Sequence, residues 1–122
     1  MREIKFKAWD KKDKAMHEVA LLETTRGGGF DYRTVYFTSA TSDNGGFRHY
    51  PEVELMQFAD KYDKNGNEIY ESDVVEYNEE RGVIKFEEGC FWISFDTRAN
   101  TINEFYSYEL EVIGNIHEKV AE

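Results

Sequence analysis

Residues 82–95 read GVIKFEEGCFWISF, two short apolar runs on either side of an acidic turn. Val83–Phe86 and Cys90–Phe95 are rich in β-branched and aromatic side chains, which are typical of strands. Glu87, Glu88 and Gly89 lie between the runs and supply the turn. This spacing predicts an antiparallel hairpin, and it places the second half of the chain in the β class.

Short strand patterns recur on both sides of this hairpin, and no helical pattern of about 12 residues interrupts them. On the N-terminal side, residues 4–22 read as a hairpin around the polar residues 10–14, and residues 30–37 resume as a strand. On the C-terminal side, residues 101–106 and 110–116 are further candidate strands. We therefore predict a mainly β protein built of two strand-rich lobes.

The first lobe is predicted to span residues 1–60, and it contains a polar loop near residues 38–50 that we expect to be mobile. The second lobe spans residues 61–122 and is expected to resemble a small Src-homology-type barrel. We expect the two lobes to form one continuous domain. The predicted core of the second lobe consists of Val74, Val83, Phe86, Phe91, Ile93, Val112 and Ile116.

The composition limits the class of protein. The chain of 122 residues is 40% hydrophobic and 16% aromatic, which excludes a disordered chain despite a net charge of −10. No apolar run approaches the roughly 20 residues of a membrane helix, and we expect no secretory signal, because residues 1–10 alternate charged and apolar side chains. Because a single cysteine, Cys90, cannot form an internal disulfide, we expect a cytoplasmic protein.

The charge is unevenly distributed along the sequence. Residues 1–60 carry 9 Lys and Arg against 10 Asp and Glu, a net charge of −1. Residues 61–122 carry 6 against 15, a net charge of −9. An acidic second half repels phosphate, which argues against direct nucleic-acid binding through this half.

Residues 61–73, KYDKNGNEIYESD, gather acidic and amide side chains around one glycine and pose the question of a calcium loop. Placing Gly66 at position 6 of such a loop puts Lys61 at position 1 and Ser72 at position 12, where carboxylates are needed. Asn65 and Gly66 are instead the favoured pair for a tight turn between strands that needs a positive φ at both central residues. We predict a turn here, and no metal.

No other motif in the sequence predicts chemistry. The histidines His17, His49 and His117 lack zinc-ligand spacing, although a spatial cluster stays open. Cys90 lies in an apolar strand and is interpreted as a structural thiol. No nucleophile or phosphate-loop motif is present. We therefore predict no catalytic, cofactor-binding or metal-binding residue and no cofactor.

Five stretches together resemble the YopX family of phage and prophage proteins. They are REIKFKAWDKKDKAMHEV at 2–19, VELMQF at 53–58, DKNGNEIYESDVV at 63–75, GVIKFEEGCFWI at 82–93 and VIGNIHE at 112–118. The resemblance implies a mostly β protein of phage or prophage origin that acts in the bacterial cytoplasm, and it implies no reaction or cofactor. Ser72 departs from the family pattern, which usually has a glycine there that would permit a positive φ.

Two hypotheses about function follow. The first is a non-enzymatic protein-binding or self-assembling module, in which the basic N-terminal hairpin of one copy contacts the acidic half of another copy, or a host or phage protein is bound. Its predicted partner-binding residues are Trp9, Tyr32 and Tyr36 with Lys5 and Lys7. The alternative is an acidic decoy that mimics nucleic acid and binds a DNA-binding protein of host or phage.

Overall fold

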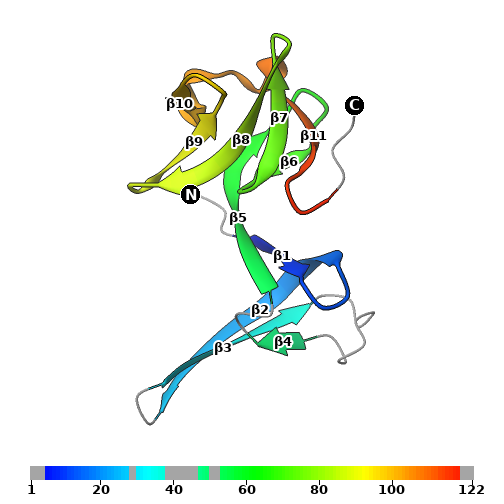
Figure 1. The fold of residues 1–122 in the computed structure, drawn as a ribbon, viewed down its shortest axis with the longest axis vertical. Coiled ribbons are helices and arrows are strands. Elements are labelled where there is room, and N and C mark those ends of the chain that lie inside the picture. The colour runs from blue at the N-terminus through cyan, green and yellow to red at the C-terminus, as the bar shows by residue number, and fades with distance from the viewer. Residues whose placement is uncertain (1–4, 28–29, 38–46, 50–52, 119–122) are drawn as a thin grey trace. The chain divides into compact units, whose positions relative to one another are not determined.

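Figure 1 shows the computed structural model, which describes residues 5–27, 30–37, 47–49 and 53–118, with the backbone alone between residues 21 and 52. Strands dominate the described residues, and two short 3-10 helices accompany them, which confirms the predicted mainly β fold. The chain divides into an N-terminal unit, Lys5–Met56, and a C-terminal unit that begins at Gln57.

The N-terminal unit contains the antiparallel meander β4-β3-β2-β1, which is part of a six-stranded sheet with the order β4-β3-β2-β1-β5-β6. Its strands are β1 (Phe6–Asp10), β2 (Ala15–Gly27), β3 (Phe30–Phe37), β4 (Phe47–His49) and the first part of β5 (Val53–Tyr62). The predicted hairpin of residues 4–22 is confirmed, because β1 pairs with β2 from Lys7 opposite Glu18 to Asp10 opposite Ala15. The loop expected near residues 38–50 lies outside the described residues, apart from the short strand β4.

The C-terminal unit contains an antiparallel sheet with the order β10-β9-β8-β7-β11. Its elements are the rest of β5, β6 (Glu68–Tyr70), β7 (Asp73–Tyr77), β8 (Glu80–Glu87), β9 (Cys90–Ser94), β10 (Ala99–Thr101), η1 (Ile102–Glu104), η2 (Ser107–Glu109) and β11 (Glu111–Asn115). The hairpin predicted from residues 82–95 is confirmed as β8 and β9, with Phe86 opposite Phe91. The candidate strand at residues 101–106 is wrong, because this segment winds into η1 after β10.

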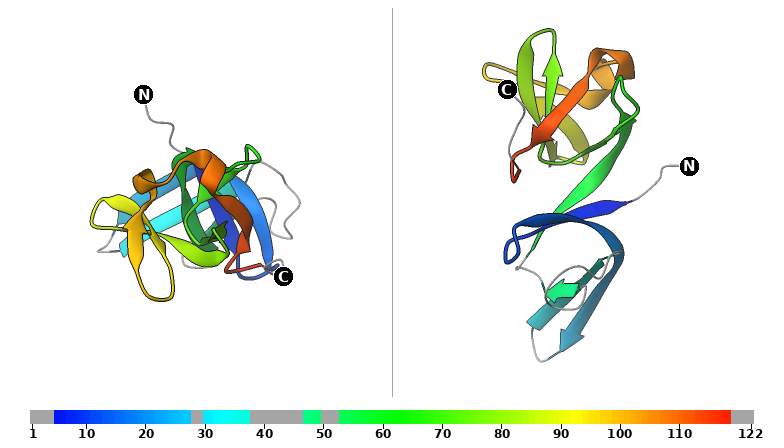
Figure 2. Two further views of the ribbon diagram at one scale, coloured as in Figure 1. Left: turned by 90° about the horizontal axis from the view of Figure 1, so that it is seen from above. Right: turned by 90° about the vertical axis from the view of Figure 1, so that its right-hand side faces the viewer.

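The sheet of the C-terminal unit curves around its core without closing into a barrel. Figure 2 shows this curvature from two further directions. Among the described pairings, β10 and β11 lie at the two ends of the sheet order and do not pair with each other. The expected likeness to a small barrel therefore holds for the curvature of the sheet and not for its closure.

The core of the C-terminal unit is one apolar cluster. It contains Ala59, Ile69, Val75, Ile84, Phe91, Ile93, Phe95, Ile102, Phe105 and Leu110, with Tyr77 and Val112 packed against it. Of the predicted core, Val74, Phe91 and Ile93 are buried. Val83 is half-buried, since side chains alternate along a strand and its neighbour Ile84 takes the inward position.

Two predicted core residues are exposed. Phe86 ends the inward face of β8 next to the turn, where its ring contacts Phe91 at a centroid distance of 4.7 Å but keeps 40% of its surface exposed. Ile116 follows the end of β11 and lies in a turn. Both errors come from counting apolar residues without the exact end of each strand.

Candidate functional site

The acidic turn between β5 and β6 is organised by one buried carboxylate. Asp63 Oδ1 accepts hydrogen bonds from the backbone N–H groups of Asn65 (2.9 Å) and Asn67 (2.8 Å). Asp63 Oδ2 accepts from the backbone N–H of Val112 at 2.8 Å and from the Asn67 side chain at 3.4 Å. Burial raises the pKa of Asp63, but these hydrogen bonds together outweigh it and hold the pKa below its ordinary value.

This geometry makes the turn a structural junction. Both carboxylate oxygens of Asp63 face N–H donors, so a cation at this position would have to displace those donors. Gly66 has a φ of +81°, as the predicted turn requires, and β5 pairs with β6 through Tyr62 opposite Glu68. A turn at this position is therefore confirmed, but the predicted type is wrong, because Gly66 has a positive φ and Asn65 does not.

A second buried carboxylate joins three segments of the C-terminal unit. Asp73 Oδ2 accepts from the backbone N–H of Tyr70 at 2.8 Å, and Asp73 Oδ1 accepts from the Asn115 side chain at 3.0 Å. The preceding residue, Ser72, donates its N–H to Ile84 O at 2.8 Å and accepts from Ile116 N at 2.9 Å. Ser72 has a φ of +70°, the left-handed conformation that a glycine adopts without strain.

Asp10, Asp13 and His17 form a group that could hold a metal ion among the described residues. Their ligand atoms lie within 4.8 Å of one another. Spacing alone did not reveal the group, but the hairpin register does: His17 lies opposite Ala8, so it is a diagonal neighbour of Asp10 on the same face.

The same group shapes the turn between β1 and β2. Asp10 Oδ1 accepts the N–H of Lys12 at 3.0 Å. Asp13 Oδ1 accepts the N–H of Ala15 at 3.1 Å, and Asp13 Oδ2 contacts His17 Nε2 at 3.3 Å. The carboxylates of the turn are therefore directed at its own backbone and at His17.

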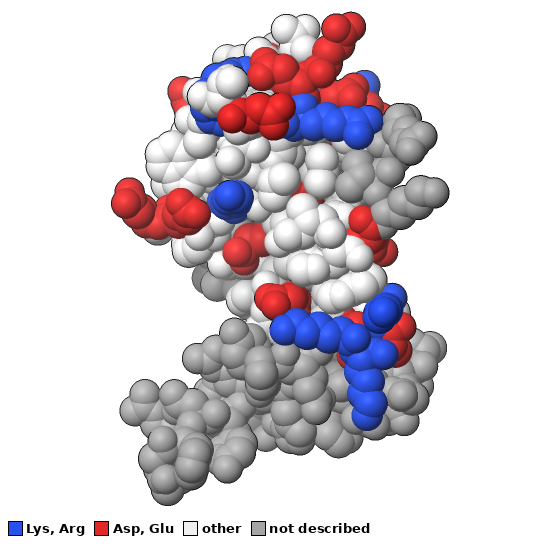
Figure 3. All heavy atoms as spheres, viewed as in Figure 1, with Lys and Arg blue, Asp and Glu red and all other residues white. Residues whose placement is uncertain are grey.

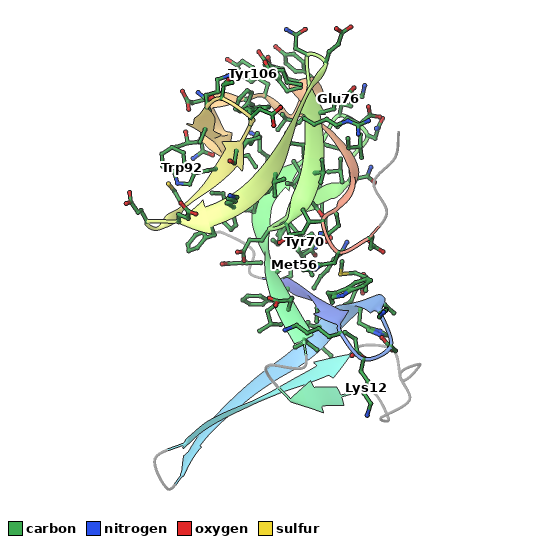
Figure 4. The ribbon with its side chains drawn as sticks, in the orientation of Figure 1. Lys12, Met56, Tyr70, Glu76, Trp92 and Tyr106 are labelled. Atoms are coloured by element: carbon green, nitrogen blue, oxygen red, sulfur yellow. The ribbon has the colours of Figure 1, made fainter. Side chains whose placement is uncertain are left out.

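We call residues 11–14 the lysine turn, because Lys11, Lys12 and Lys14 are all exposed there. Lys11 Nζ forms an ion pair with Glu54 Oε1 at 3.1 Å, and both side chains keep nearly half of their surface exposed. Figure 3 shows Lys and Arg side chains gathered on the described part of the N-terminal unit, and Figure 4 labels Lys12 there. The turn thus presents cations outward and holds its carboxylates inward.

The partner-binding residues predicted from sequence are placed differently. Trp9 lies on β1 opposite Met16 and is half-buried, as are Lys5 and Lys7. Tyr32 and Tyr36 lie on β3, and their side chains are outside the described residues. The role of these five residues in partner binding stays a prediction. The exposed lysines of the β1–β2 hairpin lie in its turn.

Among the residues whose side chains the structure describes, the most exposed aromatic residues lie between β10 and β11. Tyr106 and Tyr108, which we call the tyrosine platform, expose 67% and 71% of their surface. Their rings are stacked, with a centroid distance of 5.4 Å and an interplanar angle of 5°. Figure 4 shows Tyr106 on the outside of the C-terminal unit. Sequence reasoning missed the pair, because it assigned the segment to a strand.

Two buried neighbours hold the tyrosine platform in place. Phe105 precedes it and contacts Tyr77 edge to face at a centroid distance of 4.8 Å, while Leu110 follows it and is fully buried. Between these anchors, Glu109 Oε1 accepts the backbone N–H of Tyr106 at 2.8 Å. The Glu109 carboxylate also lies near Lys61. Partial burial lowers the pKa of Lys61, and the charge of Glu109 offsets part of this decrease.

An acidic decoy would present a row of carboxylates at Glu68, Glu71, Asp73, Glu76, Glu79 and Glu80, and most of them are engaged within the C-terminal unit. Glu71 accepts the N–H of Gln57, Glu68 accepts the Tyr70 hydroxyl, and Asp73 is buried. Ion pairs join Glu76 to Arg81 at 3.8 Å and Glu80 to Arg98 at 2.8 Å. Glu79 and Glu80 are the exposed members of the row.

Cys90 lines a shallow cavity of about 280 Å³ together with Ala59, Asp60, Gly89, Phe91, Ile102 and Asn103. The thiol is half-buried. A reactive cysteine needs a neighbouring cation or histidine to stabilise the thiolate, and the cavity lining contains neither. The interpretation of Cys90 as a structural thiol stays a prediction.

Comparisons with known proteins agree with this architecture. A family model described as "YopX protein" matches residues 5–120. Among solved structures, protein EF1440 from Enterococcus faecalis superposes with a TM-score of 0.57 at 23% identity, over 96% of this chain and 95% of that chain. At this identity the likeness concerns the fold. The comparison with curated proteins gives no match. Within the described residues, no helix is long and apolar enough to span a membrane.

Proposed function

The chain belongs to the YopX family, and on that basis we propose that it is a non-enzymatic phage or prophage protein that serves as a protein-binding or self-assembling module in the bacterial cytoplasm. We favour self-assembly. The family brings no reaction with it, so the proposal is argued from the surfaces of this chain.

One observation carries the proposal: the two units of the chain differ in charge. Residues 1–56 carry 9 Lys and Arg against 9 Asp and Glu, a net charge of 0. Residues 57–122 carry 6 against 16, a net charge of −10. Complementary potentials steer association and fix the orientation of partners. Each copy thus carries a strongly acidic unit and, on the other unit, an outward-facing lysine turn.

The buried carboxylates support a role other than catalysis. Asp63 and Asp73 accept hydrogen bonds from the backbone and from amide side chains that hold strands together. A general acid or base needs a pKa near the working pH, and the hydrogen bonds to Asp63 move its pKa away from that range. The buried carboxylates of the C-terminal unit therefore have a structural role.

Light scattering at low and high salt tests the proposal. At low salt we expect a molar mass above that of the monomer, and it should fall as salt screens the contact over about 8–10 Å. A monomeric mass at every protein and salt concentration would refute self-assembly. If that monomer also captured a DNA-binding protein from infected host cells, the decoy hypothesis would take its place.

A further inference from the structure

We infer that the tyrosine platform, Tyr106 and Tyr108, is the docking surface for the lysine turn of a second copy of this chain. The inference rests on the proposed function and assigns its contact surface. The contact is heterologous, because a surface of the acidic unit meets a different surface on the basic hairpin of the next copy.

The tyrosine platform has the form of a binding surface. Both rings are mostly exposed, and because they stack on each other, each presents its outer face and its edge to solvent. The flanking core residues Phe105 and Leu110 fix the backbone on both sides, which reduces the entropy lost when a partner binds. The packing of the C-terminal unit uses Phe105 and Leu110 and leaves the two tyrosines outside the core cluster.

The charge around the tyrosine platform selects a cationic occupant. Glu104 and Glu109 lie on the same segment, and the unit as a whole carries a net charge of −10. A lysine ammonium is attracted to the face of a tyrosine ring within about 6 Å of its centroid. Exposed aromatic rings on a unit with this net charge therefore favour a lysine-bearing segment over an acidic or purely apolar one.

Every copy of the chain carries such a lysine-bearing segment, the lysine turn. Lys12 and Lys14 are exposed, and the carboxylates of Asp10 and Asp13 are directed into the turn rather than beside the ammonium groups. Lys14 has a φ of +55°, and its N–H donates to Asp10 O at 2.8 Å, so the turn is a defined structure. Long lysine stems can also cover the tyrosine rings with their methylene groups.

Two variants, each defective in one surface, test the inference. Tyr106→Ala with Tyr108→Ala removes the tyrosine platform, and Lys12→Glu with Lys14→Glu reverses the charge of the lysine turn. Circular dichroism checks that both remain folded, which we expect because all four side chains are exposed. By sedimentation velocity over a concentration series, each variant alone should associate at least about tenfold more weakly than the unmodified chain.

Mixing the two variants provides the decisive measurement. Each variant retains the surface that the other lacks, so an equimolar mixture should form a dimer that cannot grow further. The matched control, Tyr106→Phe with Tyr108→Phe, keeps both rings and should associate like the unmodified chain. If the alanine variant associates normally while salt still dissociates it, the docking surface is wrong and the proposed assembly stands. If the unmodified chain never associates, the proposed assembly itself is refuted.

Discussion

Ser72 shows how a single residue can adopt a backbone conformation that its side chain disfavours. Its φ of +70° costs a residue with a Cβ about 1 kcal/mol or more, whereas glycine adopts it freely. The hydrogen bonds to Ile84 and Ile116 hold this conformation in place. The serine that departs from the family pattern therefore occupies the conformation that the family glycine would permit.

We expect Ser72→Gly to stabilise the protein by about 1 kcal/mol, because removing the Cβ relieves the backbone strain. The matched control is Ser72→Ala, which keeps the Cβ and should leave stability close to that of the unmodified chain. Urea denaturation of the three proteins measures the differences. Equal stability of the glycine and alanine variants would mean that this backbone carries no strain.

Asp63 should make stability depend on pH. Its folded pKa is lowered, so its contribution is fully present above the unfolded pKa, about 3.9, and is lost as the pH falls through the lower folded pKa. Asp63→Asn should destabilise the protein by about 1–3 kcal/mol at neutral pH, since the amide cannot accept all the same hydrogen bonds. Below about pH 4, the unfolding free energy of Asp63→Asn should also change less with pH than that of the unmodified protein.

Denaturant titrations at several pH values measure both effects. Asp96→Asn is the control, because it removes an exposed carboxylate with the same change of charge. If the two variants lose stability in parallel as the pH falls, the hydrogen bonds to Asp63 do not set the acid sensitivity.

The turn around Asp63 should also be indifferent to calcium. Because its carboxylate oxygens face backbone N–H groups, no site gains free energy from the ion, and ligand-linked stabilisation is absent. We expect the same melting temperature with and without millimolar calcium. An increase of several degrees, lost in Asp63→Asn, would show that the turn rearranges to bind the ion.

At the scale of elements, strand patterns predicted the hairpins but not the segment that presents the tyrosine platform. Alternation and turn residues are local signals, so the hairpin of β8 and β9 could be read from the sequence. The segment after β10 follows no strand period, because Phe105 and Leu110 face inward across two short 3-10 turns. The group of Asp10, Asp13 and His17 required the hairpin register, which spacing alone does not supply.

Gly82 in β8 and Gly66 in the turn before β6 have different structural roles. Substituting each of them by alanine should show this difference. A Cβ on Gly82 would lie 2.5 Å from Ile93 Cγ2, inside the packed core, whereas a Cβ on Gly66 would meet nothing within 4 Å. We expect Gly82→Ala to cost about 2–3 kcal/mol through overpacking. Gly66→Ala should cost about 1 kcal/mol through its positive φ alone.

Thermal and urea denaturation measure both costs, and a second substitution separates the two mechanisms. Ile93→Ala removes Cγ2, the atom that the added Cβ would meet, so Gly82→Ala should cost less in the Ile93→Ala background than in the unmodified chain, because contacting residues couple. Ile93→Ala should not reduce the cost of Gly66→Ala. Equal costs at Gly82 and Gly66, with no coupling to Ile93, would contradict the close approach.

At the scale of the whole molecule, the charge difference acts on folding as well as on association. Ten net negative charges on residues 57–122 repel one another in the compact state, and unfolding lets them separate. Salt should therefore affect the protein in two opposite ways. It screens repulsion within the acidic unit, and it also screens attraction between copies.

We expect salt to raise the melting temperature of the dilute, monomeric protein while it weakens association at higher concentration. Glu79→Gln with Glu87→Gln removes two exposed charges, so this variant should melt at a higher temperature at low salt, and the gain should shrink at high salt. Differential scanning calorimetry at low and high salt measures the shifts. If salt lowered the melting temperature of the monomer, attraction within each chain would dominate, and the acidic unit would lack the unbalanced field that docking of the lysine turn requires.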